Sequence, residues 1–208
     1  MTPKIKICGM TNIENIGEVL QLKPDFLGFI FHPTSPRCVT GKAESAQIRA
    51  LNTSVITTGV FVDASTESML ETAKEYGLKA IQLHGNEQPE VCAMLQKEGY
   101  IVIKTFGMET EADLDQTEQF AGCTDFFLFD TRSVSHGGTG QIFNWNILKN
   151  KTITNPWILA GGLSPENIDL AIATGCHALD LNSRFELKPG IKDVERLRRA
   201  ITLIRNRK

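Results

Sequence analysis

Two side chains that can move protons follow apolar runs in this chain. Cys8 comes directly after the strand-like run "KIKI", and Asp130 comes directly after the wholly apolar run Phe126–Phe129. Partial burial raises the pKa of a carboxyl group, which suits a general acid. Nearby cations or backbone N–H groups favour a thiolate, which suits a base or a nucleophile. Each residue alone also has a structural interpretation, as buried packing for Cys8 and as a cap or loop residue for Asp130.

Three short segments late in the chain, two of them rich in glycine, could bind an anion. They read "HGGTGQ" at His136–Gln141, "AGGLS" at Ala160–Ser164 and "NSRFE" at Asn182–Glu186. Glycine lets backbone N–H groups approach an anion closely, so the sequence predicts a phosphate site here, although one such segment alone could be a tight turn. The expected phosphate-binding residues are Gly137, Gly138, Gly140, Gly161, Gly162, Asn182 and Ser183.

Alternating apolar and amphipathic segments indicate the elements that must position these groups. Strands are predicted at Ile5–Cys8, Phe26–Phe31, Ile56–Val62, Ala80–His84, Ile101–Phe106, Phe126–Asp130, Trp157–Ala160 and Ala178–Asn182. Helices are predicted at Ile13–Leu22, Ala43–Leu51, Glu67–Tyr76, Glu90–Lys97, Glu111–Phe120, Trp145–Leu148, Pro165–Thr174 and Val194–Arg205. Eight such alternations are typical of parallel βαβ units.

Two architectures fit this alternation, a doubly wound open sheet and a closed (β/α)₈ TIM barrel. Eight repeats without a linker, a low-complexity tract or a charge block favour the barrel, as one α/β domain over residues 1–208. The alternation of side chains along a strand would turn Cys8, His84, Asp130 and Asn182 inward at the carboxyl ends of their strands. Barrel enzymes build their active sites at that end.

The composition excludes several classes of function. Hydrophobic residues make up 41% of the chain and the formal net charge is −2, so we expect a globular protein that binds neither nucleic acid nor an anionic membrane. We find no apolar run long enough to cross a membrane and no signal-peptide pattern. The five cysteines show neither metal-ligand spacing nor a disulfide framework. We therefore expect a cytoplasmic enzyme without a metal ion.

Segments from end to end resemble the phosphoribosylanthranilate isomerases of tryptophan biosynthesis. In chain order they read "KICGMTN", "LGFIFHPTSPR", "GVFVD", "IQLHGNE", "FLFDT" followed by "GGTGQIFNW", "LAGGLSPENI" and "DLNSRFELKPGIKD". The resemblance implies an Amadori rearrangement of N-(5-phosphoribosyl)anthranilate, an aldose–ketose isomerisation of a small phosphorylated substrate with no cofactor and no obligate protein partner. It implies Cys8 as the general base, Asp130 as the general acid and Arg37 as the residue that binds the anthranilate carboxylate.

Two further residues are expected near the substrate. His84 is placed there by strand parity, although a histidine at a strand end is often structural, and Asp180 shares an inward face with Asn182. Two positions depart from the pattern of the family. Arg184 stands beside the expected phosphate site where many members have a small residue, and His32 stands where an aromatic residue is frequent.

Three other functions remain open from the sequence. Lys104, in "IVIKTF", could be a Schiff-base nucleophile, although a lysine inside a barrel more often pairs with a buried carboxylate such as Asp180. Another isomerase or epimerase of phosphorylated sugars could use the same scaffold. A barrel that only binds its ligand would keep the glycine segments but would not need Cys8 or Asp130.

Overall fold

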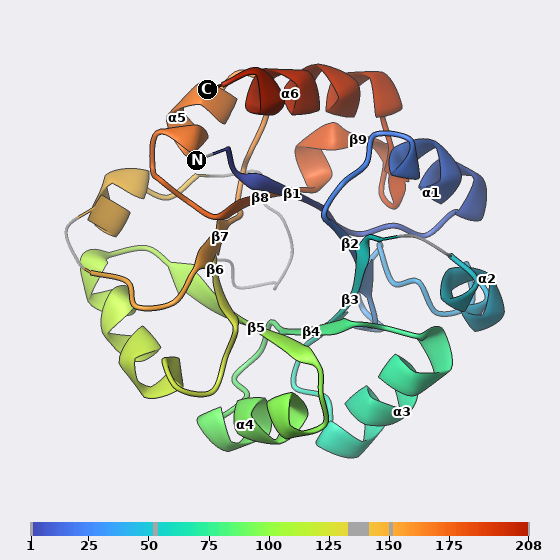
Figure 1. Ribbon diagram of the computed structural model, residues 1–208, viewed down its shortest axis with the longest axis horizontal. Helices are drawn as coiled ribbons and strands as arrows, with labels where there is room; N and C mark the ends of the chain where they lie inside the picture. Colours follow the sequence, from blue (N-terminus) through green and yellow to red (C-terminus); the bar gives the residue numbers. More distant parts are fainter. Residues whose placement is uncertain (1, 52–53, 133–141, 150–151, 208) are drawn as a thin grey trace.

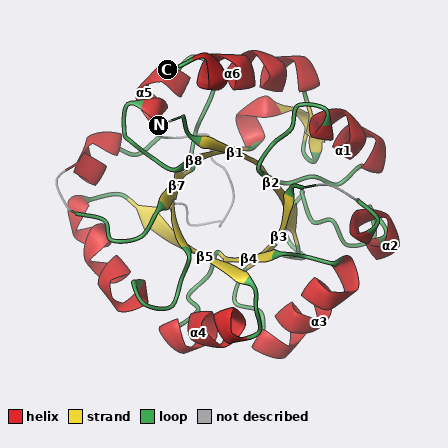
Figure 2. Cartoon of the chain, in the orientation of Figure 1, coloured by secondary structure: helices red, strands yellow, loops and turns green. Residues whose placement is uncertain are grey.

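The strands of this protein form a closed barrel. The computed structural model describes residues 2–51, 54–132, 142–149 and 152–207. Eight parallel strands follow one another in sequence order, and β8 pairs with β1 to close the sheet. Figures 1 and 2 show the strands around the centre with helices outside them. The barrel is therefore confirmed, and the open doubly wound sheet is excluded.

The strands lie where the apolar runs predict them. Their bounds are β1 (Lys4–Ile7), β2 (Phe26–Ile30), β3 (Ile56–Phe61), β4 (Ala80–Leu83), β5 (Ile101–Met108), β6 (Phe126–Thr131), β7 (Trp157–Leu159) and β8 (Ala178–Leu181). Parallel strands are covered on both faces, which explains why most of these runs are rich in apolar residues. Three of the predicted inward residues, Cys8, His84 and Asn182, stand just beyond the ends of their strands.

The described helices surround the barrel (Figure 2). The α-helices are α1 (Ile13–Leu20), α2 (Ser45–Arg49), α3 (Thr66–Tyr76), α4 (Pro89–Lys97), α5 (Ile168–Ile172) and α6 (Val194–Asn206). The 3₁₀-helices are η1 (Glu111–Phe120), η2 (Trp145–Lys149) and η3 (Ser183–Phe185). The last α-helix begins after Asp193, whose side chain accepts a hydrogen bond from the Arg196 N–H at 2.9 Å.

Four predicted helices differ clearly from the observed ones in type or length. Helix α2 spans only Ser45–Arg49, where Ala43–Leu51 is predicted. The segment Glu111–Phe120 is a 3₁₀-helix, in which the Thr117 hydroxyl donates to the Leu114 carbonyl at 2.7 Å and competes with α-helical bonding. The segment at Trp145 is also 3₁₀. Helix α5 starts only at Ile168, because the Asn167 side chain bonds the Ser164 N–H at 2.8 Å and the Gly162 carbonyl at 3.0 Å. That turn fastens the loop that follows β7.

A short hairpin that the sequence analysis did not predict lies between β8 and α6. Its strands are β9 (Glu186–Lys188) and β10 (Ile191–Lys192), and Glu186 is the cross-strand partner of Lys192. The hairpin follows η3 directly, so both side chains are close to the carboxyl end of β8.

The barrel interior changes from apolar to polar toward the carboxyl ends of the strands. A small apolar cluster lies inside the barrel below and beside the pocket, formed by Ala80, Ile103, Leu128, Ile158, Ala160 and Ala178. Two residues further along β8 and β4 come the buried side chains of Asp180 and Gln82. The apolar layer therefore supports a polar layer, and a larger core packs the outside of the barrel against the helices.

In the part of the chain that the structure describes, no helix is both long enough and apolar enough to cross a membrane.

We expect Ile103→Ala to lower the free energy of unfolding by about 2–5 kcal/mol, because Ile103 is fully buried in the small interior cluster. Leu203→Ala is the matched control, since Leu203 on α6 is 44% exposed and its loss should change stability by only about 0.5 kcal/mol. Urea unfolding measures both values. Equal effects of the two substitutions would contradict the close packing of the interior.

Candidate active site

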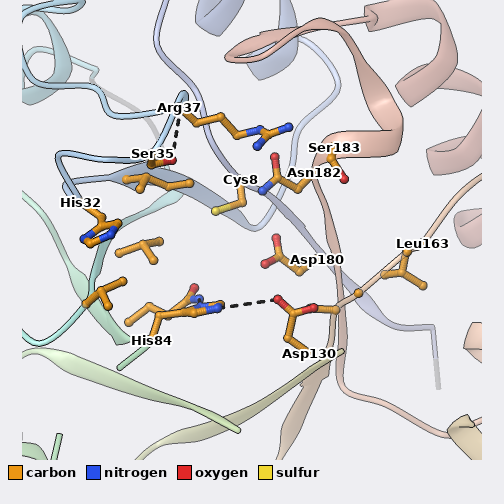
Figure 3. A pocket seen from close by; sticks show the side chains of 17 residues that line it. Cys8, His32, Ser35, Arg37, His84, Asp130, Leu163, Asp180, Asn182 and Ser183 are labelled. Carbon is orange, nitrogen blue, oxygen red and sulfur yellow. Dashed lines mark hydrogen bonds and ion pairs between the residues drawn. The ribbon is translucent and has the colours of Figure 1, made fainter. Parts of the chain in front are cut away.

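A pocket opens at the carboxyl ends of the strands, as the barrel predicts. Figure 3 shows the side chains that line it. The predicted site residues that line the pocket are Cys8, Arg37, His84, Asp130, Gly161, Gly162, Asp180, Asn182 and Ser183. The three remaining ones, Gly137, Gly138 and Gly140, lie outside the described residues. Residues that are far apart in sequence therefore meet in one cavity.

Cys8 is buried at the end of β1, with only 3% of its surface exposed. Its backbone N–H donates to the Leu181 carbonyl at 3.1 Å, which fixes it against β8. The neighbouring strand β2 has Gly28 beside it, and a Cβ at that position would lie 2.7 Å from the Cys8 sulfur. Only a glycine there leaves space for the thiol.

An ion pair between Lys6 and Asp180 joins β1 to β8 inside the barrel. Lys6 Nζ lies 2.8 Å from Asp180 Oδ2, the lysine side chain is fully buried and the aspartate side chain is 8% exposed. The strand register explains the pair, because Lys6 is directly opposite Asp180. Among the described residues, Asp180 Oδ1 is buried and has no hydrogen-bond partner. Asp180 therefore lines the pocket with one oxygen held by Lys6 and the other buried beside it.

The surroundings of Cys8 act on its pKa in opposite directions. Burial raises the pKa of the thiol, Lys6 lowers it, Asp180 raises it and Lys192 lowers it, and the net pKa lies above the ordinary value. The cations expected from the sequence are present, but burial outweighs them. Lys6 itself loses basicity through burial and regains more from Asp180 and Cys8, so its pKa is raised and it stays charged.

Asp130 near the end of β6 faces the same pocket. Its Oδ1 accepts a hydrogen bond from the Thr131 N–H at 2.8 Å, and its Oδ2 lies 3.7 Å from His84 Nε2. Burial and the nearby charge of Asp180 raise the pKa of Asp130 to about 6, against the lowering effects of Thr131 and Lys6. The direction of this shift agrees with the expectation from the apolar run Phe126–Phe129.

His84 lies across the pocket from Asp130 (Figure 3). Its Nδ1 is 3.0 Å from Gln82 Nε2, and the same Gln82 nitrogen donates to Thr105 Oγ1 at 3.3 Å. This chain of contacts orients the ring so that Nε2 is the atom nearest to Asp130. Gln82 is a pocket residue that the sequence analysis did not list.

Arg37 reaches the pocket from the loop after β2, but its side chain is already paired. Its Nε and Nη2 contact both oxygens of Glu186 at 2.7–3.0 Å, and Glu186 also accepts from Lys192 Nζ at 2.8 Å. The sequence analysis missed Glu186 and Lys192. The only signal for them was the segment "KPGIK", whose Pro-Gly pair is typical of a turn.

The loop after β7 contributes backbone conformations that favour glycine. Gly161 and Gly162 have φ of +81° and +67°. A Cβ at Gly161 would lie 2.7 Å from Thr131 N and 2.8 Å from Asp130 Oδ1. This loop therefore passes very close to the end of β6, and its backbone approaches the pocket without a side chain between. Arg184, beside Ser183, is exposed.

Lys104 does not pair with Asp180, so that part of the sequence analysis is wrong. Its Nζ lies 2.9 Å from Glu87 Oε2 and donates to the Gly85 carbonyl at 2.6 Å. Its neighbour Ile103 points into the barrel interior, so Lys104 lies on the outer face of β5, away from the inward-pointing Asp180, and the turn after β4 supplies a carboxylate on that face. Lys104 therefore stabilises the turn that follows His84 and is not one of the residues lining the pocket, which removes the support for a Schiff-base lyase.

Across residues 2–51, 54–132, 142–149 and 152–207, no group of three or more His, Cys, Asp or Glu side chains is placed to hold a metal ion.

Comparison with known proteins identifies the family. Residues 5–202 match the family model for N-(5'-phosphoribosyl)anthranilate (PRA) isomerase. The chain belongs to the PRA isomerase family. An N-(5'-phosphoribosyl)anthranilate isomerase of Parabacteroides distasonis is 43% identical over 205 residues, which are 96% of this chain and 92% of that protein.

Solved structures of PRA isomerases agree with this fold. The crystal structure of the Thermus thermophilus phosphoribosyl anthranilate isomerase superposes with a TM-score of 0.87 at 32% identity, covering 99% of this chain and all of that one. A second PRA isomerase was solved in complex with reduced 1-(o-carboxyphenylamino)-1-deoxyribulose 5-phosphate. It is 31% identical, with a TM-score of 0.83 and 98% of both chains covered.

We expect Asp130→Asn to stabilise the protein increasingly as the pH rises. The folded pKa of about 6 lies above the value of about 3.9 of an unfolded aspartate, so the wild type loses stability as the pH rises through this interval. Asparagine does not ionise, and its advantage over the wild type should therefore grow by about 2–3 kcal/mol between about pH 3.5 and 7.5. Urea unfolding across this range tests it. A difference that does not depend on pH would contradict the raised pKa.

Proposed function

We propose that this protein converts N-(5-phosphoribosyl)anthranilate into 1-(2-carboxyphenylamino)-1-deoxyribulose 5-phosphate by an Amadori rearrangement, in tryptophan biosynthesis, as a single-domain cytoplasmic enzyme. Family membership supports the reaction. The observation that carries the mechanism is the placement of a thiol and a carboxyl group with a pKa of about 6 on facing parts of one pocket. These are the two groups that the proton transfers of this reaction need.

Asp130 acts first, as the general acid. It donates its proton to the ring oxygen of the ribofuranose, the bond from that oxygen to carbon 1 breaks, and the nitrogen lone pair forms a C=N bond. The opened sugar is then an iminium ion. With a pKa of about 6, Asp130 keeps its proton in about one molecule in ten at pH 7, whereas an ordinary aspartate would keep it in about one in a thousand.

Cys8 acts second, as the general base. The iminium makes the proton on carbon 2 acidic; the thiolate removes it, and the electron pair left behind forms the C1=C2 bond of an enolamine. Tautomerisation of the enolamine gives the aminoketose. The iminium nitrogen belongs to the substrate, so the substrate supplies its own electron sink. Lys6 and Lys192 lower the pKa of the thiol and so stabilise the thiolate that the step needs.

The remaining pocket residues bind and orient the substrate. The loops after β6, β7 and β8 would bind the phosphate through Gly137, Gly138, Gly140, Gly161, Gly162, Asn182 and Ser183. Asp180 and the ring of His84 would contact sugar hydroxyls, and Arg37 would bind the anthranilate carboxylate. Two anionic ends held in this way would fix the sugar between Cys8 and Asp130.

An assay of the purified protein with phosphoribosylanthranilate generated in place tests the reaction directly. Loss of substrate fluorescence with formation of the aminoketose supports the proposal. A protein that binds the substrate without turning it over is a binding barrel, and turnover of bare phosphorylated sugars in its place indicates a different isomerase.

We expect Cys8→Ser and Asp130→Asn each to lower kcat by about 10²–10⁴-fold. A serine hydroxyl is a much poorer base at neutral pH than a thiolate, and an amide cannot protonate the ring oxygen. KM should change little, because neither residue is proposed to hold the phosphate or the carboxylate. Steady-state kinetics of the folded variants measure this, with the double variant losing less than the product of the two single losses. Turnover of Cys8→Ser near that of the wild type would return Cys8 to a packing role.

We expect Arg37→Ala to raise KM far more than it lowers kcat. The guanidinium would hold the carboxylate equally in the bound substrate and in the transition state, so its loss removes uniform binding. Arg37→Lys should recover little, because a lysine cannot form two parallel hydrogen bonds. An unchanged KM in Arg37→Ala would exclude Arg37 from the substrate site.

A further inference from the structure

Arg37, Glu186 and Lys192 form a buried charge triad at the edge of the pocket. Arg37 Nε lies 3.0 and 2.9 Å from the two Glu186 oxygens, and Arg37 Nη2 lies 2.7 Å from Oε2. Lys192 Nζ lies 2.8 Å from Oε1, which also accepts from the Gly190 N–H at 3.1 Å. The side chains of the three charged residues are 12%, 4% and 0% exposed. Every contact of Glu186 is therefore charge-assisted or made to the backbone.

The hairpin of β9 and β10 fixes Glu186 in this position. Its register sets Glu186 opposite Lys192, and its turn contains Gly190 with a φ of +87°. A Cβ at Gly190 would collide with the Thr11 hydroxyl, which donates to the Gly190 carbonyl at 3.0 Å. The turn is therefore docked on the loop after β1. The backbone of the β9–β10 hairpin, which is a separate two-stranded sheet outside the barrel, therefore sets the position of Glu186.

The pairing geometry leaves one edge of the Arg37 guanidinium open. Glu186 occupies the side edge, formed by Nε and Nη2. Among the described residues, Nη1 makes no hydrogen bond. The end edge formed by Nη1 and Nη2 can therefore donate two parallel hydrogen bonds to a second carboxylate. Figure 3 shows the side chain extending from the loop after β2 toward Asn182 and Ser183.

The charges of the triad favour an anion at that edge. Two cations and one carboxylate carry a net charge of +1 in a buried place, and a further carboxylate would balance it. Burial raises the pKa of Glu186, but Arg37 and Lys192 lower it by more, so Glu186 stays ionised. Lys192 also donates to Asn182 Oδ1 at 2.8 Å, which ties the triad to the loop after β8.

We infer that Glu186 is a positioning residue for substrate recognition: it holds the side edge of Arg37 so that the end edge is presented to the substrate's aromatic carboxylate. Lys192 compensates the charge of Glu186 and keeps it in place. The inference rests on the proposed function, since it explains how Arg37 of the same site is positioned to bind the anthranilate carboxylate. It predicts that Glu186 matters only for ligands that have this carboxylate.

Two probes test this by calorimetric titration. One is reduced 1-(o-carboxyphenylamino)-1-deoxyribulose 5-phosphate, and the other is the same compound with aniline in place of the anthranilate. Glu186→Gln should weaken binding of the first about tenfold or more, the loss of a charge-assisted contact, and should leave the second within about twofold. In steady-state kinetics it should raise KM in the same proportion and leave kcat nearly unchanged.

Two comparisons separate positioning from a general structural role. In an Arg37→Ala background, adding Glu186→Gln should cause no further loss of affinity for the first probe, because Glu186 acts through Arg37. Glu195→Gln is the matched control, since Glu195 on α6 is exposed and its ion pair is with the exposed Arg198. This variant should bind both probes like the wild type. If Glu186→Gln does not fold, Glu186→Asp is measured in its place, with a smaller loss expected for the first probe only.

Equal weakening of both probes, or no weakening of either, overturns the inference. A wild-type protein that turns over phosphoribosylanthranilate while Glu186→Gln binds both probes normally refutes the inference alone. A wild-type protein with no turnover refutes the proposed function. The two failures are therefore distinguishable.

Discussion

The ion pair between Lys6 and Asp180 is the interaction on which the site depends. It is buried within the barrel, next to both Cys8 and Asp130, and its two charges act on both of them. Lys6 lowers the pKa of the thiol and of the Asp130 carboxyl, whereas Asp180 raises both. Burial raises both as well, so Lys6, together with Lys192, favours the thiolate of Cys8, and Asp180 helps Asp130 to retain a proton.

Burying the charges of Lys6 and Asp180 costs stability, and the packing of the surrounding apolar residues offsets this cost. A buried ion pair repays its desolvation only when its geometry is good, and here the register of β1 and β8 sets the two groups opposite each other. The apolar cluster below supplies the packing that the polar layer does not. The site also needs glycine at two positions. A side chain at Gly28 would occupy the space of Cys8, and a side chain at Gly161 would collide with the end of β6.

The periodicity of the sequence predicted the barrel and much of the pocket, because strand parity and a common sheet edge are local rules. Cys8, His84 and Asp130 lie at that edge for this reason. The charge partners were not predictable in the same way. Lys104 lies on the outer face of β5 and meets Glu87 because the turn after β4 brings that carboxylate to it. Arg37 meets Glu186 across 149 positions of sequence through a hairpin with almost no apolar signal. Likewise, η1 is a 3₁₀-helix where the apolar spacing favours an α-helix, and within it the Thr117 hydroxyl donates to the Leu114 carbonyl.

The central claim is that the pocket holds Asp130 as an acid close to neutral pH. Carbon-13 NMR of the aspartate side-chain carboxyls, followed between about pH 3.5 and 8, measures this directly, and the signal that disappears in Asp130→Asn identifies the residue. We predict a titration midpoint of about 6 for that signal, set by burial and by Asp180. A midpoint near the ordinary value of about 3.9 would contradict the account.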